Sequence, residues 1–205
     1  MGDRLDIHPV TPQARLMQQA ARSVLAGGLL VVPTDAGYSL VWSIDAIDAE
    51  NRVQRLRALD SRHPFTVLCA SISQIGSLAK LDDRGFRIVK SLTPGPITFI
   101  LPAGAELPRR LKQSKRRAIG CRIPDNPVTQ ALLEAAGSPL LATSLVLPGE
   151  SFDSHDAFEV AQGMLRHADF MLDAGDCPPG PTSVLDLTGA EPQVTRLGFH
   201  PLHLD

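Results

Sequence analysis

Hydroxyl and guanidinium side chains stand at or near the ends of several apolar stretches of this sequence. An arginine presents a planar fork that binds phosphate or carboxylate through two parallel hydrogen bonds, and a hydroxyl both donates and accepts. Such groups bind anions by position and charge, and they suit neither nucleophilic catalysis nor a metal centre. The candidate residues are Thr34, Arg57, Thr98, Arg122, Ser144, Ser183 and Arg196. They predict a site that holds a phosphate and a carboxylate.

The motifs of several other enzyme classes are absent from the sequence. It has no Gly-Lys pair for a phosphate-binding loop, and no G-x-G-x-x-G, H-E-x-x-H or G-x-S-x-G. The six histidines are scattered, and the three cysteines Cys69, Cys121 and Cys177 are too widely spaced to indicate a zinc site or a disulfide framework. We therefore predict no protein-bound metal.

The stretch 27–40 combines a buried strand with a polar turn. Residues 29–32 are apolar and rich in Leu and Val, which is typical of a strand buried on both faces. Pro33 has no N–H to donate and is predicted to end the strand. The following turn is the place where α/β proteins often carry binding groups, although an ordinary turn explains the same residues. The turn residues are Thr34, Asp35, Gly37 and Tyr38.

Apolar periodicity predicts an α/β chain with no repeat and no domain boundary, so we expect a single domain over residues 1–205. Helices are predicted at 11–27, 45–59, 73–79, 82–92, 126–137 and 157–166. Strands are predicted at 29–32, 65–69, 97–101, 118–124, 140–146, 168–172, 182–187 and 193–197, with an extended arm or edge strand at 1–10. The stiff turn 93–96, with two prolines around one glycine, is either a preorganised wall of a site or a tight connection.

The two halves of the chain carry opposite charge. The net charge is −2, but up to Pro124 there are 18 basic and 10 acidic residues, and from Asp125 onward 2 basic and 12 acidic. This asymmetry predicts either a basic face directed at phosphates or pairing between the halves. Hydrophobic residues make up 43% of the chain, enough to bury a core. The sequence has no signal peptide and no long apolar run, so we expect a cytoplasmic protein without a membrane partner.

The densest positive charge lies in one cluster. Residues 109–122 hold seven cations, and no acidic residue occurs from Leu107 to Pro124. A charge run of this kind is usually a solvated face, but its density also indicates a polyanionic partner, RNA or nucleotide. No aromatic side chain lies in the cluster, so stacking on bases there is not supported. The predicted RNA-binding residues are Arg109, Arg110, Lys112, Lys115, Arg116 and Arg117.

Seven short stretches, in this order, resemble the YrdC/YciO family over essentially the whole chain, and they are most similar to its YciO branch. The stretches are Pro33-Thr34-Asp35-Ala36-Gly37-Tyr38, Arg55-Leu56-Arg57, Phe65-Thr66-Val67-Leu68-Cys69, Thr93-Pro94-Gly95-Pro96-Ile97-Thr98-Phe99, Gly120-Cys121-Arg122-Ile123-Pro124, Ala142-Thr143-Ser144-Leu145 and Thr182-Ser183-Val184-Leu185-Asp186. A single match of this length would be weak, whereas seven in order are specific. The resemblance implies a twisted sheet of mixed parallel and antiparallel strands with flanking helices and a concave basic surface.

The resemblance also implies the family's reaction. ATP with Mg²⁺, bicarbonate and L-threonine give threonylcarbamoyl-AMP and pyrophosphate, for the threonylcarbamoyladenosine modification of tRNA. By match, the substrate-binding residues are Thr34, Tyr38, His63, Arg122, Ala142 and Ser183. The nucleotide-binding residues are Arg55, Arg57, Thr98, Ser144 and Arg196, and Arg57 and Arg122 are the catalytic pair. Rate would come from alignment of the reactants and stabilisation of charge.

Three positions depart from the synthases of the family. Arg55 stands where they carry Lys, and Val146 stands where they carry Asn. The stretch 36–40 replaces their Thr-Val-Tyr-Gly-Leu. An ammonium and a guanidinium are not equivalent, and a valine side chain makes no hydrogen bond. The alternative function is therefore a non-catalytic protein of the YciO type that binds double-stranded RNA or tRNA through the cluster in 109–117.

Overall fold

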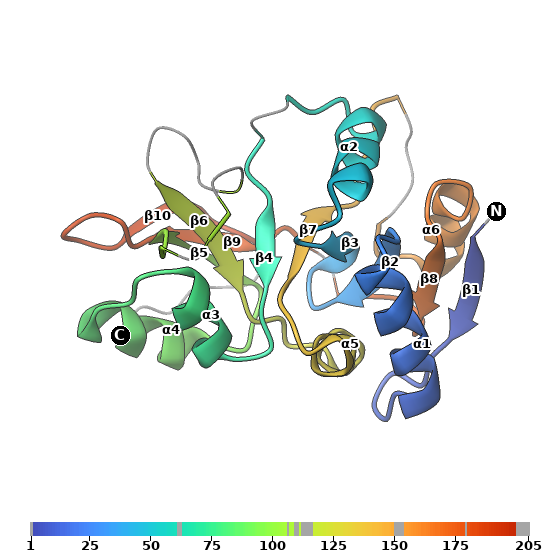
Figure 1. Cartoon of the computed structure of the whole chain (residues 1–205), viewed down its shortest axis with the longest axis horizontal. Coiled ribbons are helices and arrows are strands. Elements are labelled where there is room, and N and C mark those ends of the chain that lie inside the picture. The colour runs from blue at the N-terminus through green and yellow to red at the C-terminus, as the bar shows by residue number, and fades with distance from the viewer. Residues whose placement is uncertain are drawn as a thin grey trace.

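The fold is built around one mixed sheet with helices packed beside it (Figure 1). The computed structural model describes residues 2–60, 63–105, 107–108, 111, 117–149, 154–178 and 180–199. In these residues the sheet has ten strands, in the order β1-β8-β2-β3-β7-β4-β6-β5-β9-β10. They are β1 (Asp3–Asp6), β2 (Leu30–Thr34), β3 (Gly37–Ser43), β4 (Thr66–Leu68), β5 (Ile97–Pro102), β6 (Ala118–Arg122), β7 (Leu140–Ser144), β8 (Phe170–Asp173), β9 (Ser183–Asp186) and β10 (Gln193–Arg196).

Each helix predicted from the sequence overlaps a helix of the structure. The helices are α1 (Ala14–Leu25), α2 (Ile47–Leu56), α3 (Ile72–Leu78), α4 (Asp83–Leu92), α5 (Pro127–Ala136) and α6 (Ala157–Met164). Local chemistry explains the ends of α4 and α5. The Asn126 side chain accepts hydrogen bonds from two backbone N–H groups of the first turn of α5, and Asp82 does the same for one N–H of α4. Gly137 ends α5 in the left-handed conformation that glycine adopts without strain.

The strand pairing is both parallel and antiparallel. β4 pairs with β6, β5 with β9, and β8 with β1 and β2, all in parallel, whereas β3 is antiparallel to β2 and β7. The strand β4 lies between β7 and β6, far from its neighbours in the sequence. The mixed sheet with flanking helices that the family resemblance implied is thus confirmed.

The stretch after β2 corrects one prediction. Pro33 does not end the strand, because β2 continues to Thr34 and Pro33 pairs with Tyr38 of β3. The β8 ladder contacts only the beginning of β2, so the missing N–H of Pro33 leaves no strand partner unsatisfied. The turn is a two-residue hairpin at Asp35 and Ala36, and Tyr38 belongs to a strand rather than to the turn.

Two apolar cores lie on opposite faces of the sheet. Neighbouring residues of one strand alternate between them, as Val31 and Val32 of β2 and Val67 and Leu68 of β4 illustrate. Helices α1 and α5 pack against each other and belong to the smaller core. Helices α2, α3, α4 and α6 contribute to the larger one. Helix α5 contacts β2 and α1 contacts β3. The cavity described next lies further along the same sheet face, over β4, β5 and β6.

Candidate functional site

A cavity of about 400 Å³ lies over the middle of the sheet. Its volume is within the range of small-molecule sites. Strand register brings its floor together, because Thr66 pairs with both Ala142 and Gly120, and Gly120 pairs with Ile100. The next row of the same face holds Leu68 and Arg122. The lining residues are Ala36, Ser39, Arg57, His63, Pro64, Phe65, Thr66, Leu68, Thr98, Ile100, Gly120, Arg122, Ala142, Thr143, Ser144, Pro181, Thr182, Val184 and Arg196.

Arg122 forms the buried end of the cavity. The residue is only 5% exposed, and its Nη2 forms an ion pair with Oδ1 of Asp35. Its Nε donates to the carbonyl of Gly95 at 3.4 Å. Burial lowers the pKa of Arg122, and the charge of Asp35 acts in the opposite direction. The guanidinium remains charged, since an arginine begins far above neutral pH.

The β2–β3 turn fixes the partner of Arg122. The Thr34 hydroxyl donates to the carbonyl of Gly37 at 2.6 Å and accepts from the N–H of Ala36 at 3.0 Å. These two bonds close the hairpin around Asp35. Gly37 has φ +79°, and an added Cβ there would also meet the ring of His155 at 3.1 Å. The backbone at Asp35 is therefore held by the turn, and the ion pair with Arg122 holds its carboxylate.

Arg57 enters the cavity from the end of α2. Its Nε donates to the carbonyl of Val146 at 3.1 Å, and its Nη1 donates to the hydroxyl of Thr143. Both acceptors follow or belong to β7, so the guanidinium is oriented by a strand rather than by solvent. Burial lowers the pKa of Arg57, as expected for a charged group that is partly removed from water.

Arg196 approaches from β10 on the other side of the cavity. Its Nε donates to the carbonyl of Thr182 at 3.0 Å, and its Nη2 donates to the Thr182 hydroxyl at 2.9 Å. The same hydroxyl lies 3.4 Å from that of Thr98. A chain of polar groups thus connects an exposed arginine to the floor of the cavity.

A family model described as "Telomere recombination", that of the Sua5/YciO/YrdC proteins, matches residues 22–198. The chain belongs to the Sua5/YciO/YrdC family. The protein YciO of Escherichia coli strain K12, described as uncharacterised, is 44% identical over 192 residues, which cover 94% of this chain and 93% of YciO. The family includes threonylcarbamoyl-AMP synthases. That of Pyrococcus abyssi is 29% identical over 188 residues, and these cover 89% of this chain but 54% of the synthase.

Solved structures of the Sua5/YciO/YrdC family share the fold. The crystal structure of E. coli YciO superimposes with a TM-score of 0.91 at 43% identity, covering 98% of each chain. The structure of P. abyssi Sua5 complexed with L-threonine superimposes with a TM-score of 0.86 at 23% identity, covering 95% of this chain and 57% of Sua5. This chain therefore spans little more than half of the Sua5 protein.

The fold brings together seven of the site residues predicted from the family resemblance. All of them line the same cavity, although they come from separate segments between α2 and β10. They are Arg57, His63, Thr98, Arg122, Ala142, Ser144 and Arg196. Their roles toward substrate or nucleotide remain predictions.

Four predicted site residues do not line the cavity. Tyr38 points to the opposite face of β3, where its hydroxyl donates to the carbonyl of Gly175 at 2.8 Å, and burial raises its pKa. Arg55 is exposed on α2. Ser183 is buried and its hydroxyl accepts from the N–H of Gly198 at 2.9 Å, while the Thr34 hydroxyl is used within its own turn. The structure thus does not bring these four into the cavity lining, and their roles toward substrate or nucleotide remain predictions.

The cavity also holds polar residues that the sequence reading did not single out. Ser39 lines the cavity while its neighbour Tyr38 does not, and Thr182 lines it while its neighbour Ser183 does not. Thr66 and Thr143 also line the cavity. In a strand, neighbouring side chains point to opposite faces, so a choice of the wrong parity selects the wrong residue of a pair. Alternation along the chain places Thr66 and Leu68 on one face of β4, but only the pairing of β4 with β6 and β7 shows that this face lines the cavity.

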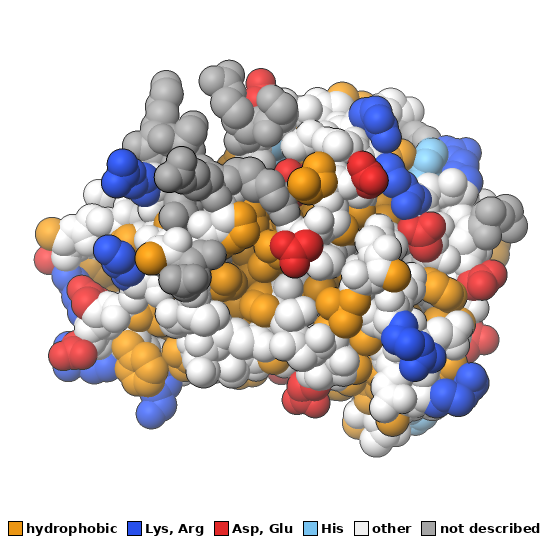
Figure 2. Space-filling model, viewed as in Figure 1, with side chains coloured by type: hydrophobic (Ala, Val, Ile, Leu, Met, Phe, Trp, Pro, Cys, Tyr) orange, Lys and Arg blue, Asp and Glu red, His pale blue; other side chains and the backbone are white. Residues whose placement is uncertain are grey.

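The basic cluster lies mostly beyond the residues that the structure describes. Arg117 is described and is exposed, while Arg109, Arg110, Lys112, Lys115 and Arg116 are outside the described residues. On the face drawn in Figure 2, the described Lys and Arg side chains are spread among acidic ones. The concave basic surface and RNA binding therefore remain predictions from the sequence.

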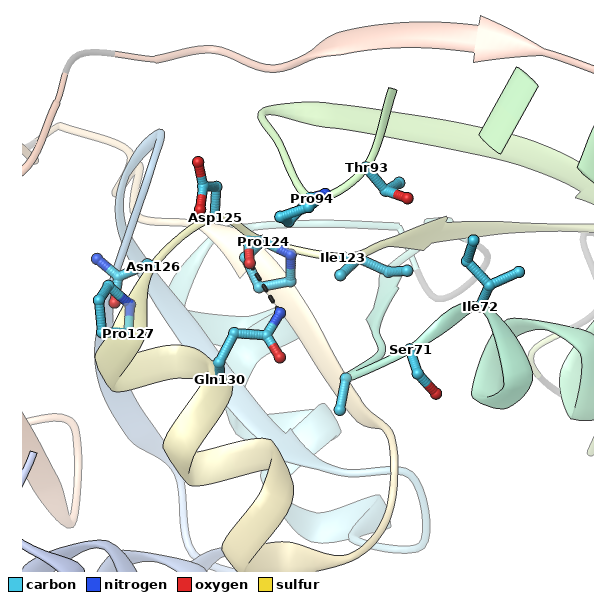
Figure 3. A pocket seen from close by; sticks show the side chains of 11 residues that line it. Ser71, Ile72, Thr93, Pro94, Ile123, Pro124, Asp125, Asn126, Pro127 and Gln130 are labelled. Atoms are coloured by element: carbon cyan, nitrogen blue, oxygen red, sulfur yellow. Dashed lines mark hydrogen bonds between the residues drawn. The ribbon is translucent and has the colours of Figure 1, made fainter. Parts of the chain in front are cut away.

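A second cavity, of about 360 Å³, lies beside the stiff turn before β5 (Figure 3). Its wall includes Pro94 and Ile123, and the side chain of Gln130 reaches the carbonyl of Pro124 at 2.8 Å. Gly95 stands between the two cavities, because its N–H donates to the carbonyl of Ile123 while its own carbonyl accepts from Arg122. The turn thus supplies an acceptor to Arg122 through the Gly95 carbonyl, and the side chains of Thr93 and Pro94 line the second cavity.

Two general findings concern the described ranges only. No helix there is long and apolar enough to cross a membrane. Among the same residues, no three His, Cys, Asp or Glu side chains are grouped so that they would hold a metal ion.

His63 gives the cavity a pH-dependent group. Burial and the nearby charge of Arg57 lower the pKa of His63, whereas the unfolded chain has the ordinary value of about 6.5. The unfolded state therefore binds more protons once the pH falls below about 6.5, and folding stability decreases there. We expect the wild type to lose more stability than His63→Gln between about pH 7 and about pH 5.5. Urea unfolding at several pH values measures this, and parallel curves would contradict it.

Thr182 offers a test of how Arg196 is held. Thr182→Val preserves the shape of the side chain and the carbonyl bond to Arg196 but removes the hydroxyl acceptor. For the nucleotide that the family resemblance predicts at Arg196, we expect affinity to fall about threefold to tenfold, because the lost hydrogen bond orients the guanidinium and does not itself contact the ligand. Calorimetric titration with ATP measures the effect. Thr188→Val is the matched control, because Thr188 bonds to Asp186 away from the cavity. Equal affinities in the two variants would refute the role of Thr182.

Proposed function

We propose that this protein is a threonylcarbamoyl-AMP synthase-like enzyme that binds ATP and L-threonine in the cavity over β4, β5 and β6. The reaction converts ATP, bicarbonate and L-threonine into threonylcarbamoyl-AMP and pyrophosphate. One observation carries the proposal: Arg57, Arg122 and Arg196, from distant segments, line one cavity together with six hydroxyl side chains. Family membership and the synthases among its relatives support the same activity.

The arginines of the cavity differ in burial, so the cavity has a buried end and an exposed end. Arg122 is buried and paired with Asp35, which suits a small amino acid whose carboxylate is bound in a fixed geometry. Arg57 and Arg196 are more exposed and stand at the rim, where they suit the phosphates of a nucleotide. Ser144 and Thr98 supply two of the hydroxyls that line the cavity.

Catalysis by these residues would rest on alignment and charge. Arg57 and Arg196 would neutralise charge that develops on the attacked phosphoryl group, and Arg122 would hold the amino acid in line. Mg²⁺ would arrive with ATP as part of the substrate and reduce the charge of its phosphates. The hydrogen bonds that hold Arg57 and Arg196 before any ligand arrives limit the reorganisation needed.

The two side-chain departures from the synthases affect the cavity less than their chemistry suggests. Arg55 is exposed and outside the cavity, so the exchange of Lys for Arg there leaves the lining unchanged. The Val146 side chain is 59% exposed, but its backbone carbonyl accepts from Arg57. A polar contact from the side chain at 146 is lost, whereas the orientation of Arg57 is kept.

Release of pyrophosphate tests the proposal directly. With ATP, Mg²⁺ and bicarbonate present, we expect L-threonine to increase pyrophosphate release, and a labelled carbon from bicarbonate to appear in an AMP conjugate. Arg57→Ala should abolish the threonine-dependent part of the release. Pyrophosphate release that is the same with and without L-threonine would contradict a synthase activity.

A further inference from the structure

One hydroxyl on the floor of the cavity is directed at open space. Thr66 of β4 is partly buried and lines the cavity, and its hydroxyl bonds to no other residue that the structure describes. Its Oγ1 lies 3.7 Å from the point where a Cβ on Gly120 would stand, closer than its own methyl group. Thr98 turns its methyl group to the same point, while its hydroxyl lies 3.4 Å from that of Thr182. Thr66 therefore presents its hydroxyl to the space over the Gly120 backbone.

Strand register places Thr66 between the two ends of the cavity. Thr66 pairs with Gly120 of β6, and Arg122 lies two residues further along that strand. Thr66 also pairs with Ala142 of β7, and Ser144 lies two residues away in the opposite direction, because β7 is antiparallel to β4. Two residues of a strand span about 7 Å, so Arg122 and Ser144 stand one such step from Thr66 on opposite sides.

The product of the proposed reaction has its parts in the same order as these residues. In threonylcarbamoyl-AMP, the carbon that comes from bicarbonate joins the nitrogen of the amino acid to an oxygen on phosphorus. The amino acid is proposed at Arg122, and the phosphates at Arg57, whose Nη1 donates to the hydroxyl of Thr143 beside Ser144. The group between them is a carbamate, whose oxygens accept hydrogen bonds from a hydroxyl. Its negative charge would lie between two guanidinium groups.

We propose that Thr66 binds this bicarbonate-derived group, its Oγ1 donating a hydrogen bond to the carbamate oxygen that does not attack phosphorus; the positions of the amino acid and the nucleotide rest on the proposed function. The neutral amine of L-threonine and bicarbonate form the carbamate and release water. A carbamate oxygen then forms a bond with the α-phosphorus of ATP. The bond from this phosphorus to the bridging oxygen breaks, and pyrophosphate leaves with that oxygen and its electron pair. The Thr66 hydroxyl keeps its proton and fixes the orientation of the carbamate.

The first experiment measures binding without turnover. L-Threonine is titrated calorimetrically into the protein with Mg²⁺ and α,β-methylene-ATP, whose methylene bridge prevents release of pyrophosphate, with and without bicarbonate. In the wild type, we expect bicarbonate to raise the apparent affinity for L-threonine about fivefold or more, because the carbamate is retained over Thr66. In Thr66→Val the gain from bicarbonate should fall below about twofold, while the affinity measured without bicarbonate stays the same.

Thr66→Ser is the matched control, because it keeps the hydroxyl and should keep the gain from bicarbonate. Thr66→Val should fold, since a β-branched side chain suits a strand and the lost hydroxyl leaves no described residue without a partner. Circular dichroism checks folding, and Thr66→Ala, which also lacks the hydroxyl, takes its place if necessary. The absence of a bicarbonate gain in the wild type would overturn the role of Thr66, and so would an equal gain in the variant without the hydroxyl.

Steady-state pyrophosphate release separates the role of Thr66 from the proposed function. In an active synthase, Thr66→Val should raise the KM for bicarbonate about fivefold or more, with the KM values for ATP and L-threonine changed less than about twofold. A bicarbonate gain that depends on Thr66, without threonine-dependent pyrophosphate release, would support the role of Thr66 and reject the synthase. Threonine-dependent release with the same KM for bicarbonate in wild type and Thr66→Val would support the synthase and reject the role of Thr66.

Discussion

Arg122→Met is expected to lower the free energy of unfolding by about 3–5 kcal/mol. The substitution keeps most of the volume of the side chain but leaves the Asp35 carboxylate buried without its cation. Such a carboxylate must be protonated or hydrated, and either costs stability. The carbonyl of Gly95 also loses its donor. Urea unfolding monitored by Trp42, which is buried, measures the loss.

A double variant separates charge from packing. Asp35→Asn combined with Arg122→Met removes both charges, and we expect it to recover a large part of the stability lost in Arg122→Met alone. The surface control is Arg84→Met, whose ion pair with Glu191 is exposed and should matter little. If the double variant were as unstable as the sum of its single variants, the buried ion pair would not explain the loss.

Arg57→Ala is expected to weaken ATP binding about tenfold to a hundredfold. A hydrogen bond from a charged donor contributes about 1.5–3 kcal/mol, and the Arg57 guanidinium is held toward the cavity by Thr143 and Val146. The variant should remain folded, because Arg57 lies at the end of α2 rather than in its packed face. Calorimetric titration with ATP and Mg²⁺ gives the affinity, and thermal unfolding checks the fold.

Arg55→Ala provides the matched control for Arg57→Ala. Both substitutions remove one positive charge from the end of the same helix, but Arg55 is exposed and does not line the cavity. A general loss of positive potential would weaken ATP binding equally in the two variants. A specific contact with ATP requires a much larger loss of affinity in Arg57→Ala than in Arg55→Ala. Equal ATP affinities of the two variants would show that Arg57 makes no specific contact with ATP.

Much of the secondary structure follows from local chemistry that a sequence displays. Asn126 before Pro127 begins α5 and Gly137 ends it, because a side-chain acceptor and a residue without Cβ satisfy the ends of a helix. Short apolar runs likewise indicated the buried strands β2, β5 and β7, because apolar side chains in a strand are buried on the faces of the sheet. The residue types that suit anion binding were also visible, since guanidinium and hydroxyl groups do not depend on the fold for their chemistry.

Which residues line the cavity was decided by the tertiary structure. Tyr38 and Ser39 are neighbours in the chain, as are Thr182 and Ser183, but only Ser39 and Thr182 line the cavity. Which of two neighbours faces a site depends on strand register, and register is set by pairing with strands distant in the sequence. The sequence predicted the strand that contains Thr182 but not which face it presents.

The sequence alone therefore determined the helices and most of the strands, and anion binding by the arginines stays its prediction. Tertiary structure decided that β4 lies between β7 and β6, which places Thr66 between Ala142 and Gly120 and creates the floor of the cavity. It also decided that Asp35 and Arg122 meet. The physical reason is the sequence separation of the interactions. Caps, turns and apolar runs involve residues that are close in the chain, whereas the side chains of the cavity come from distant segments and meet only when the strands of the sheet pair.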